Sequence, residues 1–212
     1  ASGELKTKPT QQSVGKLREI GIQPHVLVCR TEVAMDPDMT RKISLFCNVR
    51  PENVIEEKDV DFSIYEVPLM LIESGLDRRI LDHFVLEPRT EVDTSDWQEL
   101  LQIVKKPDHE VTIAVVGKYI ELHDAYKSIY ESLSHAGIAN RCEVKIRKIS
   151  AEQVADDGAA KLLDGVDGIL VPGGFGERGF EGKIAAIAYA REHKIPFLGI
   201  CYGMQAAVVQ FA

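Results

Sequence analysis

Residues 198–205 read Leu-Gly-Ile-Cys-Tyr-Gly-Met-Gln, and this stretch decides the fold of the second half of the chain. The apolar run 196–200 is typical of a short buried strand, and a helical pattern follows it, so Cys201 stands at a strand-to-helix turn. Gly-x-Cys-x-Gly is the cysteine form of the nucleophile elbow, a sharp turn that requires small flanking residues. A helix N-terminus favours the thiolate, which is the nucleophilic form of cysteine.

The residues before this elbow alternate between short apolar strands and helical patterns. Strands are predicted at four ranges, and helices at three ranges between them. The strand ranges are 111–116, 142–149, 168–171 and 196–200, and the helix ranges are 125–136, 151–163 and 181–193. Helices between short apolar strands indicate crossover connections and a mostly parallel sheet. The predicted fold class is therefore α/β, with Rossmann-like layers.

The first part of the chain has a different rhythm. Residues 20–30 contain an apolar run that predicts a strand, and residues 40–47 and 64–84 have helical spacing. Residues 86–95 are polar, contain a proline and lack periodicity, which is typical of a linker. Ser95 and Gln98 fit a capping box, so we expect a helix from there to about residue 106. These features predict two domains, residues 1–85 and 96–212, joined by a linker at 86–95.

The bulk composition excludes several classes of protein. The 212 residues are 45% hydrophobic and 27% charged, as in ordinary globular chains, and no apolar run reaches the roughly 18 residues of a membrane span. A net charge of −8 argues against a nucleic-acid-binding surface. The cysteines, at positions 29, 47, 142 and 201, form no CxxC pair, so neither a zinc site nor a disulfide framework is predicted. We expect reduced cysteines in a cytoplasmic protein.

A cysteine nucleophile needs an oxyanion hole and a base. The glycine-rich segment 172–176 follows a predicted strand and should lie at the same sheet edge as Cys201, so the N–H groups of Gly174 and Tyr202 are the predicted pair. No histidine follows Cys201 in this chain. His123 and His193 remain as internal candidates, although surface positions are the simpler interpretation of both.

The same glycines allow a rival hypothesis. Residues 174–179 match GxGxxG, the dinucleotide-binding fingerprint, after a strand and before a helix. That fingerprint also wants an acidic residue at the end of the next strand, where this chain has Cys201. Residues 115–118 resemble the end of a phosphate-binding loop, but Thr112 stands where its first glycine belongs. Nicotinamide binding is therefore not favoured.

The segment 6–11 is a third candidate site. It combines two ammonium groups, two hydroxyls and an amide, in Lys6, Thr7, Lys8, Pro9, Thr10 and Gln11. Such groups suit a triphosphate, because cations neutralise it and hydroxyls donate hydrogen bonds. Composition alone favours a solvated loop instead.

Taken together, these segments resemble the CTP synthase family, and the similarity runs over essentially the whole chain. It rests on the run 6–11 with the residues that follow it, on 116–128, on the glycine loop 173–182 and on 198–205. The resemblance implies an ATP-dependent ligase that aminates UTP to CTP with ammonia from glutamine hydrolysis. It also implies Mg²⁺ as a cofactor, GTP as an activator, CTP as a feedback inhibitor and a homotetramer.

The resemblance also implies roles for individual residues. Cys201 matches the thiol that forms the glutamyl thioester, and Gly174, Tyr202, Gly203, Met204 and Gln205 match the glutamine pocket. Residues 6–11 and Lys42 match the contacts to UTP and CTP. Lys58, Asp59 and Val60 match a segment that touches the base of ATP. Arg178 matches a lid that responds to GTP.

The chain departs from the family pattern at position 202, which is usually leucine in the family and is tyrosine here. The resemblance places the phosphate-binding loop and the Mg²⁺ carboxylates before Ala1, and the catalytic histidine and glutamate beyond Ala212. No metal ligand is therefore expected within this chain, both domains are expected to be incomplete, and the chain alone is expected to be inactive. Two other functions stay open: a non-catalytic UTP/CTP-binding fragment, and a glutamine amidotransferase with a different acceptor.

Overall fold

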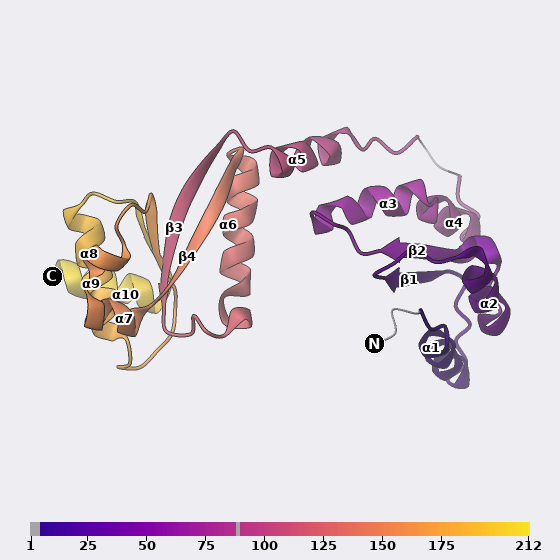
Figure 1. Ribbon diagram of the computed structural model, residues 1–212, viewed down its shortest axis with the longest axis horizontal. Coiled ribbons are helices and arrows are strands. Elements are labelled where there is room, and N and C mark those ends of the chain that lie inside the picture. The colour runs from indigo at the N-terminus through magenta and orange to yellow at the C-terminus, as the bar shows by residue number, and fades with distance from the viewer. Residues whose placement is uncertain (1–4, 88–89) are drawn as a thin grey trace. The chain divides into compact units, whose positions relative to one another are not determined.

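The computed structural model describes residues 5–87 and 90–212, and at His123 it describes the backbone only. The chain forms two compact units, residues 1–101 and 102–212, which are treated separately below (Figure 1). Both are built from parallel strands and helices, so the α/β fold class is confirmed. The predicted linker includes positions 88 and 89, which lie outside the described residues, and the domain boundaries near it stay a prediction.

The first unit contains a two-stranded parallel sheet. Strand β1 (Leu27–Thr31) pairs in register with β2 (Val54–Lys58), from Leu27 opposite Val54 to Thr31 opposite Lys58. The strand predicted within residues 20–30 is β1, which begins at Leu27 and extends one residue beyond that range. The pairing starts beyond Pro24, which lacks the N–H group that a ladder needs.

Helices α1 (Lys8–Glu19) and α2 (Pro37–Cys47) pack together in this unit. Val14 of α1 joins Ile43 and Cys47 of α2 in one apolar cluster, which Val49 and Val54 complete. Burial of these side chains is the main stabilising term for two helices of this length.

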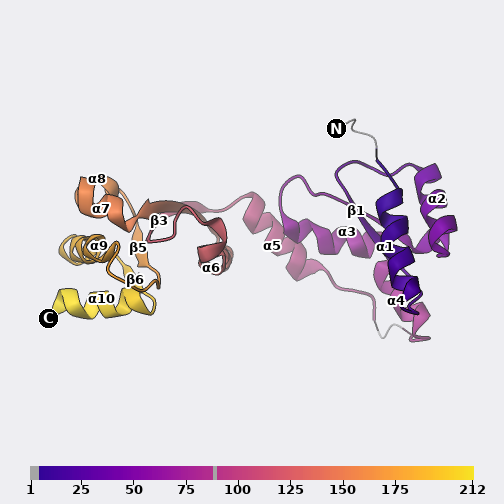
Figure 2. The ribbon, with the colours of Figure 1, turned by 90° about the horizontal axis from the view of Figure 1, so that it is seen from below.

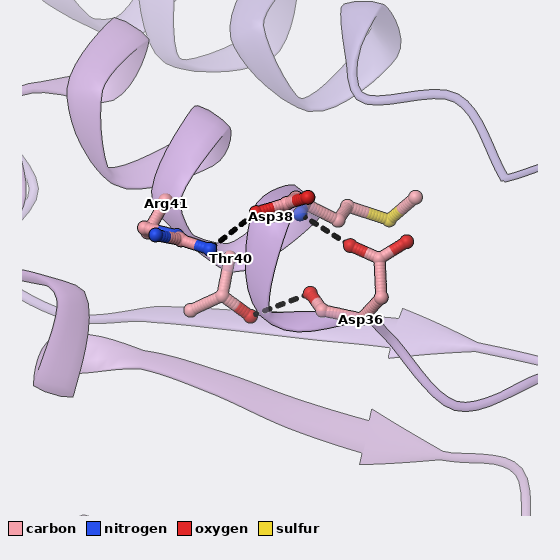
Figure 3. Close-up of polar contacts among 5 residues, drawn as sticks. Asp36, Asp38, Thr40 and Arg41 are labelled. Carbon is pink, nitrogen blue, oxygen red and sulfur yellow. Dashed lines mark hydrogen bonds and ion pairs between the residues drawn. The ribbon is translucent and has the colours of Figure 1, made fainter.

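The N-terminus of α2 is fixed by its own polar residues (Figure 3). The carboxylate of Asp36 accepts a hydrogen bond from the backbone N–H of Met39 at 2.7 Å, and Pro37 follows at the first helical position. The side chain of Arg41 reaches back to Asp38. A capped helix with proline at its start has a defined beginning, which sets the position of the later α2 residues.

The helical region predicted at 64–84 consists of several pieces. A 3₁₀ turn (Ile64–Glu66) leads into α3 (Val67–Glu73), and α4 (Leu76–His83) follows. Gly75 separates the two helices with φ 74°, a left-handed conformation that interrupts an α-helix. A second 3₁₀ turn (Pro51–Asn53) precedes β2.

Helix α5 (Ser95–Lys105) begins at Ser95, as the sequence predicted. The predicted capping pair of Ser95 and Gln98 is wrong by one residue. Gln98 Nε2 donates to Thr94 Oγ1 at 3.0 Å. Within the first unit, Trp97 of this helix donates its indole N–H to the carbonyl of Tyr65.

The second unit is a four-stranded parallel sheet in the order β4-β3-β5-β6. Its strands are β3 (His109–Gly117), β4 (Cys142–Ser150), β5 (Gly168–Val171) and β6 (Phe197–Gly199). Each lies where the sequence predicted a strand. Because every strand is parallel, the carboxyl ends of all four lie at one edge of the sheet.

Helices cover both faces of this sheet (Figure 2). Helix α6 (Lys127–Ala139) lies on one face, and α7 (Ala151–Asp157), α8 (Ala159–Leu162), α9 (Phe180–Glu192) and α10 (Tyr202–Phe211) lie on the other. Strand residues alternate accordingly: Val115 packs in the α6 cluster, whereas Ala114 and Val116 pack in the cluster of the other face. A 3₁₀ turn (His123–Tyr126) precedes α6.

The helix predicted at 151–163 is two short helices. Gly158, with φ 92°, separates α7 from α8, and this positive φ lies outside the helical region. Among the helices of the described residues, none is long and apolar enough to cross a membrane.

Candidate active site and nucleotide-binding elements

Cys201 occupies the turn between β6 and α10. Its backbone has φ 53° and ψ −111°, a conformation that residues other than glycine rarely adopt. Cys201 is exposed. Strain of this kind is characteristic of functional turns and of the nucleophile elbow in particular. The turn therefore presents the sulfur atom at the start of a helix, outside the core.

Two glycines make this turn possible. A Cβ atom at Gly203 would lie 2.0 Å from the carbonyl oxygen of Val171, and one at Gly199 would lie 2.7 Å from the backbone of Gly203. Both distances are far inside van der Waals contact and involve backbone atoms that cannot move independently. The requirement for small residues beside Cys201, which the sequence suggested, has this steric cause.

The glycine loop after β5 lies beside the cysteine. A Cβ atom at Gly173 would lie 3.5 Å from Cys201 Cβ and 4.0 Å from its Sγ. The loop is held by the N–H of Ile200, which donates to the carbonyl of Val171 at 3.0 Å. Gly174 follows with φ 132°, a backbone conformation that favours glycine.

The backbone around Cys201 leaves room for an oxyanion site. Tyr202 is the first residue of α10, so its N–H has no acceptor inside the helix. The N–H groups of Gly203 and Gln205 donate to the carbonyls of Ile200 and Cys201, at 2.9 and 3.1 Å. The assignment of the oxyanion site to the N–H groups of Gly174 and Tyr202 stays a prediction.

Lys183 is the residue at this site that the sequence prediction missed. It belongs to α9, is 0% exposed, and donates a hydrogen bond from Nζ to the carbonyl of Gly174 at 3.2 Å. The same Nζ lies 5.0 Å from the ring centre of Tyr202. Burial lowers the pKa of Lys183 below its ordinary value, the Lys118 ammonium lowers it further, and Cys201 acts in the opposite direction.

A signal for Lys183 was present in the sequence. The buried face of α9 consists of Lys183, Ala186, Ile187 and Ala190, which follow the i, i+3, i+4, i+7 spacing of an apolar helix face. A lysine at an apolar position of that pattern requires polar partners inside the protein, because an unpaired buried charge is costly.

The tyrosine at position 202 packs with aromatic neighbours. Its ring centre lies 5.6 Å from that of Phe175 and 5.5 Å from that of Phe180. Leucine, the usual family residue here, would keep the apolar contact but would lack the aromatic face that meets the ammonium of Lys183.

The predicted lid residue Arg178 makes contacts within the second unit. Its guanidinium lies 3.5 Å from the carboxylate of Glu152 on α7 and 6.0 Å from the ring centre of Tyr119. Lys118 Nζ donates to the carbonyl of Phe175 at 2.9 Å. The segment after β3 and the glycine loop are therefore joined by cationic side chains.

Of the two histidine candidates, His193 does not supply a base to Cys201. His193 follows the last residue of α9, at the opposite edge of the sheet from the β6–α10 turn, and it stacks on Tyr189 at 4.0 Å. Its Nδ1 lies 3.0 Å from the Tyr189 carbonyl oxygen. The side chain of His123 is outside the described part of the chain.

The basic segment 6–11 is the start of a helix, so the loop favoured by its composition is wrong. Thr7 is the buried N-cap residue of α1, and Gln11 Nε2 donates to its hydroxyl at 3.0 Å. Pro9 lies in the first turn, where its missing N–H has no cost. Lys6 and Lys8 are exposed, as is Lys42 on the neighbouring helix α2.

The segment predicted to touch ATP lies at the end of β2. Lys58 is the last strand residue and is exposed, and Val60 is half-buried. Asp59 accepts a 2.7 Å ion-paired hydrogen bond from Arg30 of β1. In residues 5–87 and 90–212 no cluster of three or more His, Cys, Asp and Glu side chains is arranged to hold a metal ion.

Comparison with known proteins agrees with these two sets of elements. The family model of the CTP synthase N-terminus matches residues 1–86, and that of class-I glutamine amidotransferases matches residues 121–212. All of this chain aligns at 56% identity with the CTP synthases of Methylorubrum extorquens and Desulfitobacterium hafniense, covering 39% and 40% of their lengths.

A solved structure is also similar. It is described as Trypanosoma brucei CTPS, glutaminase domain with bound acivicin, and it is 44% identical over 47% of this chain and 39% of that chain, with a TM-score of 0.44. The two family models and the whole-chain identity to named CTP synthases show that this chain belongs to the CTP synthase family.

Proposed function

We propose that the protein containing this chain aminates UTP to CTP, using ATP and ammonia released from glutamine. The observation that carries the proposal is Cys201, exposed on a strained elbow with the loop of Gly173 and Gly174 beside it. This chain spans about two-fifths of the length of the curated relatives it matches. The remainder of the proposal is therefore supported by family membership.

The proposed glutaminase step uses this geometry. The Cys201 thiolate attacks the amide carbon of glutamine, and the oxyanion formed is bound by the N–H groups of Gly174 and Tyr202. The C–N bond then breaks and ammonia leaves, which gives a glutamyl thioester that water hydrolyses to glutamate. The proton transfers need a general base, and we assign this role to a histidine of the complete protein outside residues 1–212.

The synthetase step belongs to the first unit. ATP would phosphorylate the uracil oxygen of UTP, and ammonia would displace the phosphate. Lys6, Lys8 and Lys42 would neutralise the triphosphate of UTP or of inhibitory CTP, and residues 58–60 would contact the base of ATP. Mg²⁺ would be held outside the described residues, and Arg178 would respond to GTP. A cytoplasmic homotetramer is part of the same proposal.

Two other functions make different predictions. A non-catalytic UTP/CTP-binding protein would be stabilised by UTP and CTP but would release no glutamate, and an amidotransferase with a different acceptor would release glutamate without a response to UTP. Thermal unfolding of the complete protein with UTP, CTP and NAD, followed by a glutamine-dependent CTP synthesis assay, separates these cases. Stabilisation by NAD alone would overturn the proposal.

The proposal also predicts that residues 1–212 alone release no glutamate, because the described residues bring no histidine side chain to Cys201. A glutaminase assay of this stretch beside the complete protein checks it. Release at even a few per cent of the complete protein's rate would mean that a base lies within the chain.

We expect Lys8→Ala in the complete protein to weaken both UTP binding and CTP inhibition by about tenfold or more. Loss of a charged hydrogen bond to phosphate costs roughly 1.5–3 kcal/mol. The measurement is the KM for UTP together with the inhibition constant for CTP.

Lys16→Ala is the matched control, since Lys16 is an exposed lysine near the other end of α1 that pairs only loosely with Glu19, at 3.8 Å. Its substitution should leave both constants unchanged. Equal values for Lys8→Ala and the unmodified protein would place the triphosphate elsewhere.

A further inference from the structure

Lys183 is buried in the core of the second unit, yet the proposed glutaminase chemistry gives it no role. A lysine ammonium is rarely buried completely unless polar groups compensate for the lost water. Two such groups surround Lys183: the carbonyl of Gly174, 3.2 Å from Nζ, and the ring of Tyr202, 5.0 Å away. Both belong to the residues that flank the reactive thiol.

The hydrogen bond fixes the glycine loop. The carbonyl that Lys183 binds belongs to the peptide that joins Gly174 to Phe175, so its direction sets the orientation of the loop over Cys201. Gly174 has φ 132° and no side chain, so local sterics restrict this peptide weakly. A buried ammonium supplies the restraint that the glycine backbone lacks.

The ammonium of Lys183 also lies beside the residues that flank Cys201. It is held against the carbonyl of Gly174, whose neighbour Gly173 lies next to Cys201, and against the ring of Tyr202, which follows Cys201. A positive charge in a site of low dielectric constant stabilises negative charge that develops nearby. Cys201 in turn supports the protonated form of Lys183.

The other charged groups near Lys183 do not replace it. Lys118 approaches from the end of β3, but its Nζ is bound to the carbonyl of Phe175. On the α7 side, Arg178 is paired with Glu152. The ring face of Tyr202 meets the ammonium of Lys183, whereas that of Tyr119 meets the ammonium of Lys118.

We propose that Lys183 is a positioning residue of the glutaminase site, which holds the Gly174 carbonyl so that the loop stays beside Cys201 and which places a positive charge next to the residues that flank the thiol. This inference rests on the proposed role of Cys201 as the nucleophile. Lys183 itself touches neither glutamine nor the reacting atoms in this account.

The test uses the complete protein and iodoacetamide as the probe. The alkylation rate of the Cys201 peptide is followed by mass spectrometry as a function of pH, which reports the reactivity of the thiol without glutamine. We expect Lys183→Met to lower this rate about tenfold near neutral pH, and Lys183→Arg, which keeps the charge and a donor, to retain the original rate.

The thermal stability of the variant separates the proposed role of Lys183 from a purely structural one. Because burial lowers the pKa of Lys183, its charged form destabilises the folded state, and this cost decreases as the pH rises through the folded-state pKa. Lys183→Met should therefore unfold at the same or a higher temperature near neutral pH while its glutaminase kcat falls. Loss of stability together with an unchanged alkylation profile would mean that Lys183 only fills the core.

Lys194→Met is the matched control, because Lys194 is an exposed lysine of the same unit. Lys183→Gln gives the same comparison if the methionine variant unfolds. An alkylation profile of the uncharged variants that coincides with the unmodified profile overturns the inference. Alkylation needs no substrate, so this outcome can be told apart from failure of the proposed function. A complete protein without glutaminase activity would overturn the proposed function instead.

Discussion

Cys201→Ala in the complete protein is expected to abolish CTP synthesis from glutamine and to preserve synthesis from free ammonia. Removal of a catalytic nucleophile lowers kcat by roughly a thousandfold or more. Ammonia bypasses the thioester, and in the proposed function the two chemistries belong to different units of the chain. The measurement is the rate of CTP formation with glutamine and, separately, with ammonium chloride.

Cys142→Ala is the control for this experiment. Cys142 is a half-buried residue at the start of β4, at the sheet edge opposite to the elbow. Its substitution should leave both rates near those of the unmodified protein. If Cys201→Ala lowered the ammonia-dependent rate as strongly as the glutamine-dependent one, the assignment of Cys201 to the glutaminase step alone would be wrong.

Gly182→Ala should strongly destabilise the second unit. A Cβ atom at position 182 would lie 1.6 Å from the carbonyl oxygen of Ala151 and 2.7 Å from its carbonyl carbon. These are backbone atoms at the contact between α9 and α7, so the helices must separate to admit one methyl group. We expect a loss of about 3 kcal/mol or more, at the upper end of the usual range for overpacking.

Proteolysis as a function of urea concentration, with the cleavage sites mapped to the second unit, measures this effect. Glu181→Ala is the neighbouring control, because Glu181 is exposed on the same helix and should change stability by less than about 0.5 kcal/mol. If the two variants resisted proteolysis equally, α9 and α7 would not be in the close contact described here.

The sheet of the second unit was predictable because three strands contain short apolar runs and the fourth, β4, alternates apolar and charged residues. Gly168–Val171 is buried at every position and is found where the sequence placed it. The helix breaks at Gly75 and Gly158 were missed because apolar spacing continues across them, whereas their positive φ values depend on the local backbone. Periodicity alone does not distinguish one long helix from two short ones.

The elbow was predictable from its glycines, since their small size is a direct steric requirement of the turn. The basic segment was harder to interpret: Lys8 and Pro9 suggest a loop by composition, but proline is well tolerated in a first helical turn, and Thr7 and Gln11 close that turn. Lys183 was missed because its partners, Gly174 and Tyr202, come from distant parts of the sequence.

In the proposed function, Cys201 is the thiol that attacks glutamine. An electrophilic glutamine analogue should therefore label the complete protein once, on the peptide that contains Cys201, as mapped by mass spectrometry. Burial raises the pKa of the Cys29 and Cys47 thiols, which makes them poorer nucleophiles. Labelling confined to Cys201 and prevented by excess glutamine is the result we predict, and labelling at Cys29, Cys47 or Cys142 in its place would contradict the account.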